Sequence, residues 1–460
     1  MKNRWKQTEA DSHSADEHTG LRVYSSQLLG QDADLVLHGG GNTSVKGTLL
    51  NAFGDTEQVL FVKGSGWDLR SIEAPGFPPV KLNTLLRLGE LEALSDSEMM
   101  RQLRLALLDP TAPTPSVEAI LHALIPHKYV DHSHADAVVA ISNSSDGDRI
   151  LQEIYGVEVL ILPYVMPGFI LAQQVRDATK NVNWNEIRGI VLLHHGIFTF
   201  HEDAKTSYDT MIELVSKAEA YLAEATSPQT IARADYQASA TDCLQLCELR
   251  QAAAVLFAAP MLLTLDNSAE AVGFASRPDC DELATRGPLT PDHSIHTKAF
   301  AAVFEADPIA GLQSFAASYQ AYFDDHANDS HQCLDLMPRF AVWRDKGMVL
   351  LAANQKRLQI VEDICRHTIK AIQWGEALGG WQALPRQDLF DVEYWELEQA
   401  KLKSTAIRSE FEGKVVVVSG AASGIGRACV CRFLNQGAAV LALDIADSLA
   451  SEFSNPAVLS

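Results

Sequence analysis

The feature that most constrains the fold is a pair of histidines separated by one residue, His132 and His134, inside an apolar stretch. The stretch is typical of a buried strand that continues through residues 138–141. Alternate side chains of a strand point to one face of a sheet, about 6–7 Å apart. Two neutral imidazoles at this spacing can bind one divalent ion, as in zinc sites. The spacing alone also fits ordinary hydrogen-bonded strand residues.

A third histidine position lies downstream, where a second buried-strand pattern over 189–196 ends in His194-His195-Gly196. The glycine lets the chain turn sharply and brings an imidazole close. Upstream, Glu118 opens an amphipathic run, which predicts the first turn of a helix, where its charge would also compensate the helix dipole. Three histidines and a carboxylate near such ends are the components of a catalytic zinc centre with an adjacent acid/base.

Two glycine-rich turns precede these elements, at residues 39–42 and 63–66, and both are expected at strand ends. Consecutive glycines let backbone N–H groups converge on an anion, and Lys63 adds a positive charge. Such turns are common by themselves. Together with the histidines they favour phosphate binding.

In this order the motifs resemble the class II (zinc-dependent) aldolase family, which includes the fuculose and rhamnulose phosphate aldolases. The resemblance spans residues 20–230 and implies that His132, His134 and His195 bind zinc. His195 is chosen over His194 because the family's ligand directly precedes the glycine. The same resemblance implies that Glu118 is the acid/base.

The resemblance also implies a phosphate site, in which one hydroxyl is expected to be missing because Val117 stands where some relatives carry a second serine. The implied phosphate-binding residues are Asn42, Ser65, Gly66 and Ser116.

Composition limits the remaining possibilities. A formal net charge of -22 argues against a nucleic-acid partner, although a local cluster of amides and hydroxyls can still bind an anionic substrate. The 460 residues, 47% hydrophobic, predict two or three domains. No apolar stretch is long enough to span a membrane, so a cytoplasmic protein is expected. The seven cysteines form no Cys-x-x-Cys and are interpreted as reduced thiols.

The predicted organisation is α/β throughout. A polar, flexible leader over residues 1–20 is followed by a three-layer class II aldolase-like domain over 21–230, where strands and helices alternate. Residues 235–405 form a middle α/β region and linker. Within it, residues 347–354 and the following helix resemble the 189–196 strand and its helix, with Ala352 and Ala353 at the places of the two histidines. This predicts a degenerate repeat that cannot hold a metal in the same way.

Other motifs of the middle region resemble the fusion proteins that join a rhamnulose-1-phosphate aldolase to a short-chain alcohol dehydrogenase. They occupy residues 287–293, 378–385 and 390–395, and their aromatic residues are interpreted as packing anchors. The segment 292–296 resembles the Asp131 segment, but its histidines are spaced differently. It is therefore interpreted as a loop with a capping aspartate.

The last predicted segment, residues 411–460, is the first β-α-β of a Rossmann fold and resembles the opening of a short-chain dehydrogenase. A buried strand, a Gly-x-x-x-Gly-x-Gly turn, a helix and a second strand ending in Asp444 follow one another. The glycines allow close approach of a pyrophosphate, and Asp444 would accept from ribose hydroxyls, which favours NAD. The predicted cofactor-binding residues are Gly420, Ser423, Gly424, Ile425, Gly426 and Asp444.

No tyrosine or lysine occurs after Lys414, so the Tyr-x-x-x-Lys pair of that family has no counterpart in this sequence. The segment is expected to be truncated and without dehydrogenase activity, and NAD is expected to matter only for a complete domain.

The sequence therefore predicts a metal-dependent lyase, with Zn²⁺ or another divalent ion, that cleaves a 1-phosphoketose. The resemblance points to L-rhamnulose 1-phosphate, giving dihydroxyacetone phosphate and L-lactaldehyde, and to a homo-oligomer. Three alternatives stay open: a pentulose-phosphate 4-epimerase, a non-enzymatic adducin-like module, and a nucleotide-binding redox module.

Overall fold

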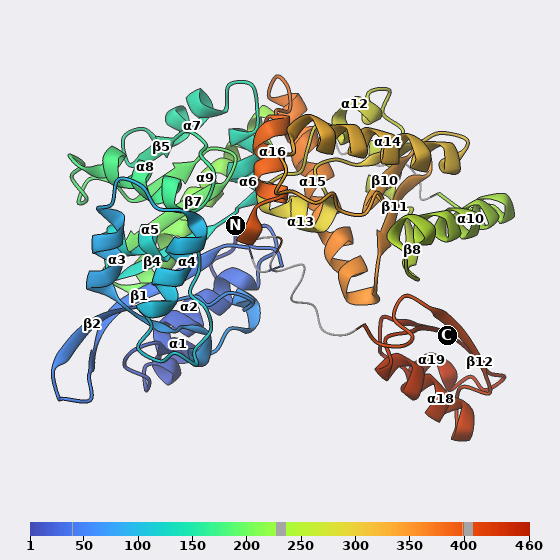
Figure 1. Cartoon of the computed structure of the whole chain (residues 1–460), viewed down its shortest axis with the longest axis horizontal. Helices are drawn as coiled ribbons and strands as arrows, with labels where there is room; N and C mark the ends of the chain where they lie inside the picture. Colours follow the sequence, from blue (N-terminus) through green and yellow to red (C-terminus); the bar gives the residue numbers. More distant parts are fainter. Residues whose placement is uncertain (39, 227–235, 398, 400–407) are drawn as a thin grey trace. The chain divides into compact units, whose positions relative to one another are not determined.

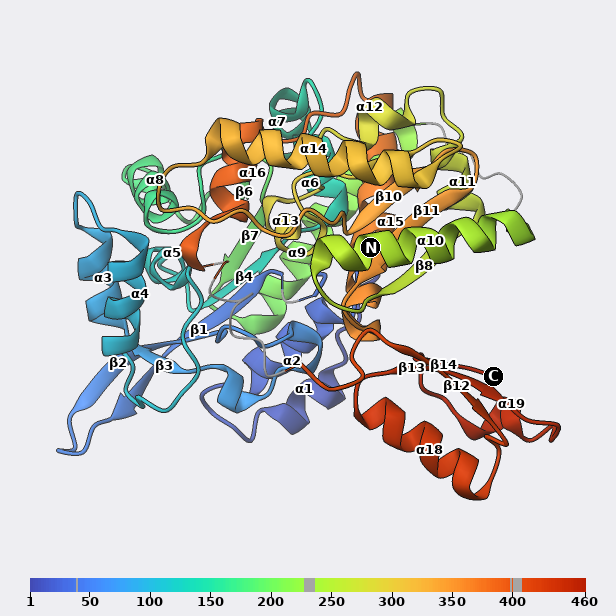
Figure 2. The same ribbon diagram turned by 45° about the vertical axis from the view of Figure 1, so that its right-hand side comes forward.

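The computed structural model describes residues 1–38, 40–226, 236–397, 399 and 408–460 (Figures 1 and 2). Gly39 of the first glycine-rich turn lies outside the described residues. The chain divides into two compact units. The first contains residues 1–228, 289–292 and 371–383, and the second contains residues 229–288, 293–370 and 384–460.

The first unit is built on a seven-stranded sheet with the strand order β3-β2-β1-β4-β7-β6-β5. Neighbouring strands are antiparallel except β5 and β6, which are parallel. The strands are β1 Asn42–Leu50, β2 Thr56–Val62, β3 Pro79–Lys81, β4 Tyr129–Ser133, β5 Val159–Leu162, β6 Gly189–Leu192 and β7 Gly196–His201.

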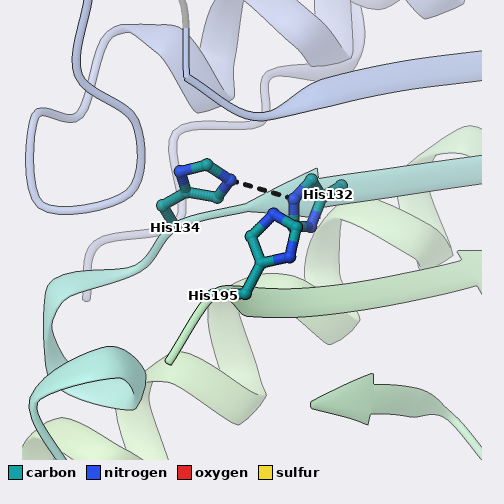
Figure 3. A group of neighbouring side chains, drawn as sticks. All are labelled: His132, His134 and His195. Atoms are coloured by element: carbon teal, nitrogen blue, oxygen red, sulfur yellow. Dashed lines mark hydrogen bonds between the residues drawn. The ribbon is translucent and has the colours of Figure 1, made fainter. Parts of the chain in front are cut away.

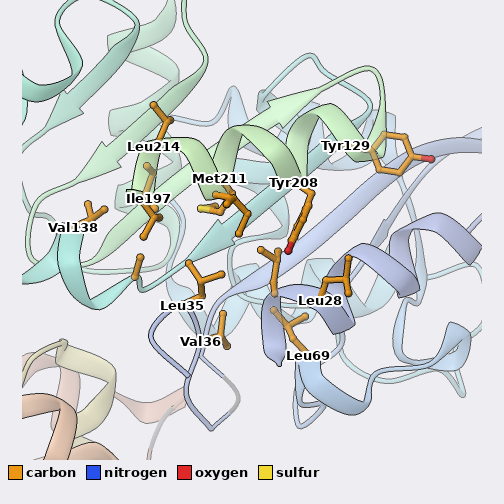
Figure 4. Packing of buried hydrophobic residues seen from close by; sticks show 14 of the residues in the cluster. Leu28, Leu35, Val36, Leu69, Tyr129, Val138, Ile197, Tyr208, Met211 and Leu214 are labelled. Carbon is orange, nitrogen blue, oxygen red and sulfur yellow. The ribbon is translucent and has the colours of Figure 1, made fainter. Parts of the chain in front are cut away.

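Helices cover both faces of this sheet because its strands are apolar on both sides. Ile197 of β7 joins one buried cluster and the next residue, Phe198, joins another on the opposite face. Figure 4 shows the first cluster, in which Met211 and Leu214 of α9 pack with Leu28 of α2. The predicted three-layer α/β architecture is thus confirmed. The helices are α1 Gln7–His13, α2 Gly20–Gly30, α3 Leu82–Gly89, α4 Asp96–Leu105, α5 Ala119–Leu124, α6 Asp136–Ser142, α7 Gly147–Tyr155, α8 Phe169–Thr179 and α9 Ala204–Ala225.

Two local predictions were wrong. The strand of His132 ends at Ser133, and residues 136–142 form helix α6 instead of continuing the strand. All seven residues of α6 are buried, so its sequence lacks the polar face that distinguishes a helix from a buried strand. Residues 1–20 are not simply a flexible leader, since α1 has a buried Ala10 and Trp5 packs edge-on against Tyr24.

The second unit contains a four-stranded sheet with the order β8-β11-β10-β9, in which only β9 and β10 are parallel. The strands are β8 Leu262–Asp266, β9 Ala302–Phe304, β10 Phe340–Trp343 and β11 Gly347–Ala352. The helices are α10 Ala240–Phe257, α11 Ala269–Ala275, α12 Cys280–Ala284, α13 Ser294–Thr297, α14 Pro308–His326, α15 Gln355–Ala377, whose residues from 371 belong to the first unit, and α16 Arg386–Glu393.

The topology of this sheet repeats that of β4-β7-β6-β5 in the first unit, including the single parallel pair at one edge. In both hairpins three residues separate the strands, Leu192 facing Gly196 and Trp343 facing Gly347. Gly347 therefore corresponds to Gly196, and the alignment of 347–354 with 189–196 was wrong. Asp345 and Lys346, not the two alanines, occupy the places of His194 and His195.

The C-terminal residues form a parallel three-stranded sheet with the order β12-β13-β14, as expected for the start of a Rossmann fold. Its elements are β12 Val415–Ser419, α18 Gly424–Asn435, β13 Ala439–Leu443, α19 Leu449–Glu452 and β14 Val458–Leu459. Among the described residues of the whole chain, no helix is long and apolar enough to cross a membrane.

Candidate metal centre

The three predicted histidine ligands converge in the first unit. His132 lies in β4, His134 follows the end of that strand, and His195 lies in the turn between β6 and β7. All three are buried, and one ring nitrogen from each falls within 4.8 Å of the others. Figure 3 shows the rings turned toward one another, with the Nε2 atoms of His132 and His134 3.0 Å apart.

The sheet register holds the ring of His132. Phe198 is its partner on β7, and the two rings stack with centroids 3.9 Å apart and planes 11° apart. On the other edge of the ring, Nδ1 donates to the carbonyl oxygen of Ile197 at 3.1 Å. A proton on Nδ1 leaves the lone pair of Nε2 directed toward His134 and His195, as a metal ligand requires.

Glycine at position 196 is a steric requirement of the site. A Cβ there would lie 2.3 Å from the carbonyl oxygen of Ser133 and 3.0 Å from Cε1 of His132. The close approach of β7 to the end of β4 brings His195 beside the other two rings. The preceding residue, His194, adopts a left-handed φ of 58° and is not part of the histidine cluster.

Burial keeps the imidazoles of His132 and His134 neutral. It lowers the pKa of His132 well below its usual range, with the neighbouring His195 as a further cause, and it lowers the pKa of His134 to about 3. Neutral imidazoles are the form that coordinates metal. Near pH 7 these two imidazoles are therefore in the form that can bind a cation.

Glu118 lies beside the histidines, at the N-cap of α5 and not inside its first turn. Its Oε2 is 3.7 Å from Nε2 of His132, and its Oε1 is 3.6 Å from Nε2 of His195. The side chain is 6% exposed, and Oε1 has no hydrogen-bond partner among the described residues. Such a carboxylate oxygen can take a metal bond or a proton.

Asn42 and Ser116, both predicted to bind phosphate, lie next to Glu118. Asn42 is the register partner of His132, and its amide donates to Glu118 Oε2 and, at 3.3 Å, to Ser116 Oγ. The sequence prediction missed His122, whose Nε2 donates to Asn42 Oδ1 and whose Nδ1 accepts from a serine hydroxyl of β1. The available signal was its position four residues after Glu118, on the same helix face.

The other two predicted phosphate residues, Ser65 and Gly66, are exposed in a loop that runs beside Ser116. Ser65 donates its backbone N–H to the carbonyl oxygen of Thr114 at 2.7 Å, and Ser116 donates to that of Lys63 at 2.9 Å. Gly66 has a φ of +86°, which explains a glycine there. The backbone therefore holds the 63–66 turn beside Ser116.

This donor set fits a divalent transition metal. Three imidazoles and one carboxylate are common zinc ligands, and tetrahedral bonds of about 2.0–2.1 Å place ligand nitrogens about 3.3 Å apart. The 3.0 Å separation of two Nε2 atoms is close to that value. Glu118 Oε1 and His195 Nδ1 are buried polar atoms without a hydrogen-bond partner among the described residues, which fits a site built to receive a cation.

The predicted nucleotide-binding turn lies in the second unit. Gly420 and Gly424 have φ values of +66° and +52°, and a Cβ on Gly426 would lie 1.9 Å from the carbonyl oxygen of Gly420. Asp444 accepts backbone N–H groups from Ala422 at 2.9 Å and from Ala446 at 3.0 Å, which lowers its pKa. The turn, with Ser423 and Ile425, lines a cavity of ≈ 650 Å³.

Comparison with known proteins assigns both halves of the chain. Residues 22–222 match the family described as Class II Aldolase and Adducin N-terminal domain, and residues 240–402 match Aldolase class II, second domain. A Bacillus subtilis (strain 168) protein named Uncharacterized oxidoreductase YuxG is 31% identical over 440 residues. The match covers 92% of this chain and 64% of that protein, so the chain spans slightly less than two thirds of its relative's length.

Two solved structures are also similar. The N-terminal class II aldolase domain of a conserved Thermoplasma acidophilum protein is 40% identical, with a TM-score of 0.44, and the match covers 48% of this chain and 99% of that one. L-fuculose-1-phosphate aldolase from Thermus thermophilus is 18% identical, with a TM-score of 0.28. That match covers 45% of this chain and 98% of the aldolase chain.

Proposed function

Because residues 22–222 and 240–402 match two class II aldolase domains, we propose that this chain is a metal-dependent lyase that cleaves a 1-phosphoketose by a retro-aldol reaction. The observation that carries the proposal is the convergence of three buried imidazoles with the Glu118 carboxylate. The substrate we propose is L-rhamnulose 1-phosphate, which would give dihydroxyacetone phosphate and L-lactaldehyde.

His132, His134 and His195 would hold the divalent ion, for which we propose Zn²⁺. When bound, the ion would supply the positive charge that stabilises negative charge developing on the substrate carbonyl oxygen as the carbon–carbon bond breaks. This stabilisation is needed only on the way to the transition state, which is the condition for accelerating the reaction.

Glu118 would move the proton. Its Oε2 is held by the Asn42 amide, which is itself fixed by His122, so the free oxygen, Oε1, keeps a defined position. Cleavage first requires a base to take the proton of the hydroxyl on the carbon that becomes the aldehyde. After the aldehyde leaves, the carbon next to the former carbonyl needs a proton, and a carboxylic acid at this position can donate it. We therefore assign the acid/base role to Glu118.

The phosphate group would bind between the two loops. Ser65 and Ser116 contribute hydroxyls, Gly66 an exposed backbone N–H, and Asn42 its amide, as the resemblance implies. Buried Lys63 adds positive charge in the same region, since it contributes to lowering the pKa of His132. A sugar phosphate substrate, a homo-oligomer and a cytoplasmic location are parts of the same proposal.

The decisive experiment measures dihydroxyacetone phosphate released from L-rhamnulose 1-phosphate, with and without a chelator. His134→Ala should abolish release, whereas His201→Ala, an exposed histidine at the far end of β7, should retain it. Absence of release by zinc-loaded protein would refute this substrate. Interconversion of pentulose phosphates by the same sample would then indicate the epimerase.

We also propose that residues 411–460 supply the adenosine-binding part of an NAD site in a complete dehydrogenase domain. The support is the positive φ of Gly420 and Gly424 at the start of α18 and the position of Asp444 after the neighbouring strand. Titration calorimetry with NAD and NADP tests this, and Asp444→Ala should weaken NAD binding. If the Asp444→Ala variant and the unchanged protein bind NAD with equal affinity, the role of Asp444 is refuted.

A further inference from the structure

One motif of the middle region, residues 287–293, has no part in the reaction proposed above. Its residues 289–292 lie within the sequence matched to the second aldolase domain, yet they belong to the first compact unit. Leu289 and Thr290 are each 1% exposed. The segment is therefore part of the packed structure around the histidines.

A hydrogen-bond network at the C-terminal end of α6 holds this segment. The amide of Asn143 donates to the carbonyl oxygen of Leu289 at 2.9 Å. The Ser142 hydroxyl donates to Asn143 Oδ1 at 3.0 Å and accepts the backbone N–H of His194 at 2.9 Å. The same two residues thus fix both the turn that carries His195 and the segment that ends at Asp292.

At the end of that segment, the Asp292 carboxylate faces the outer edge of a metal-ligand ring. Its Oδ2 lies 3.5 Å from Nδ1 of His134, while Nε2 of the same ring lies 3.0 Å from Nε2 of His132. His134 is 8% exposed and Asp292 is 37% exposed. The imidazole is thus placed between a carboxylate and the centre of the cluster.

His132 shows the same arrangement with a different acceptor, because its Nδ1 donates to the carbonyl oxygen of Ile197. Metal-ligating histidines commonly donate their second ring N–H to a carboxylate or a carbonyl, which fixes the tautomer and the ring orientation and makes the ligand more basic. Ile197 and Asp292 provide one acceptor of each kind. The expected capping role of Asp292 does not account for its approach to His134.

We propose that Asp292 is a positioning residue for the metal centre, holding the proton of His134 on Nδ1 so that Nε2 is free to coordinate the ion. The proposal rests on the metal-dependent function proposed above. It makes the second aldolase domain sequence a contributor to the active site, since residues 22–222 by themselves lack this carboxylate.

The experiment compares full-length wild-type protein with Asp292→Asn, Asp292→Glu and a matched control, Asp325→Asn, which changes an exposed aspartate of α14. The dissociation constant for Zn²⁺ is measured by competition with a chromophoric chelator, and the visible spectrum of the Co²⁺-loaded protein reports ligand geometry. Circular dichroism and hydrogen exchange establish that each variant is folded.

Asp292→Asn should weaken Zn²⁺ binding about 10- to 100-fold, the range typical for loss of such a partner. It should also shift the Co²⁺ spectrum, and kcat should largely recover at saturating metal. Asp292→Glu should restore most of the affinity, and Asp325→Asn should match wild type. Wild-type affinity and an unchanged spectrum in Asp292→Asn would overturn the role of Asp292 alone. Failure of wild-type protein to bind Zn²⁺ would overturn the metal-dependent function and, with it, this inference.

Discussion

A fully buried ion pair fixes strand β4, which carries His132. Breaking this pair gives a quantitative test of how the strand is stabilised. Arg22 of α2 bonds to Asp131 of β4, and both side chains are 0% exposed. Arg22 also donates to the carbonyl oxygens of Ser44 at 3.3 Å and Val130 at 3.4 Å. The Ser207 hydroxyl of α9 donates to the other Asp131 oxygen.

Arg22→Met leaves the Asp131 carboxylate buried with only one hydroxyl donor among these contacts, so unfolding free energy should fall by about 3–5 kcal/mol. Asp131→Leu leaves the Arg22 guanidinium buried without its carboxylate, and the unfolding free energy should fall by a similar amount. The double variant removes both charges and leaves only hydroxyls and carbonyls without partners. It should therefore cost about 1–3 kcal/mol, less than either single variant.

Hydrogen exchange followed by mass spectrometry measures the loss of stability in each segment separately. A local measurement is needed because a chain of two units need not unfold in one step. Peptides from β1 and β4 should lose protection in the single variants and regain part of it in the double variant, while peptides from β10 and β11 should not change. Single-variant costs below about 1 kcal/mol, or a double-variant cost equal to their sum, would refute the reasoning.

Three further perturbations give separable results. Gly196→Ala should weaken Zn²⁺ binding by at least about 100-fold, because the added Cβ would clash with Ser133 and His132. The control Gly347→Ala introduces an equivalent clash in the second unit and should leave the Zn²⁺ affinity unchanged. Both affinities are measured by chelator competition. When free Zn²⁺ is about 100 times its dissociation constant, removing it should lower the stability of the first unit by about 2.7 kcal/mol. Hydrogen exchange of β4 peptides measures this change. A loss of protection in β11 peptides would count against a metal site confined to the first unit. Glu393, whose pKa burial raises from 4.5 to about 7, binds a proton more tightly in the folded state, so its contribution to stability is full below pH 4.5 and is lost as pH rises through 7. The loss should be about 3 kcal/mol, and urea titrations of Glu393→Gln from about pH 4 to 8 should lack this slope.

The histidine cluster was predictable from sequence because two histidines alternate along a strand, a third precedes a glycine, and the family resemblance selected His195 over His194. The supporting residues were not predictable in the same way. His122 acts through Asn42, and Asp292 reaches His134 from 158 positions along the chain. The spacing of His122 from Glu118 signals a shared helix face but not the contact with Asn42, and no local pattern signals the contact of Asp292, because only the folded backbone brings these atoms together.

Secondary structure was harder to predict where burial was complete. Helix α6 has no exposed residue, so its apolar run fits a buried strand as well as a helix. A sharp turn at Gly196 was expected, but strand β7 after it was missed, because apolar residues continue on both sides of His194 and His195. Both errors have one cause: an element buried on every side carries no periodicity of polar residues from which its conformation can be inferred.

The repeat in the second unit separates what the fold requires from what the metal requires. Asp345 has a φ of 62°, matching the 58° of His194. A Cβ on Gly347 would lie 2.1 Å from the carbonyl oxygen of Asp266, as one on Gly196 would lie 2.3 Å from that of Ser133. A left-handed residue followed, two positions later, by glycine is therefore a requirement of this hairpin beside its neighbouring strand, with or without a metal.

The side chains at the ligand positions differ completely. β8 pairs with β11 in the register that β4 has with β7, which places Leu265 and Asn267 at the positions of His132 and His134. Lys346, at the position of His195, bonds to a carboxylate of α10 and stacks over Trp343. A lysine, a leucine and an amide cannot replace three imidazoles around a cation. Glycine at position 196 is thus required by the hairpin, whereas the proposed metal site depends on the histidines.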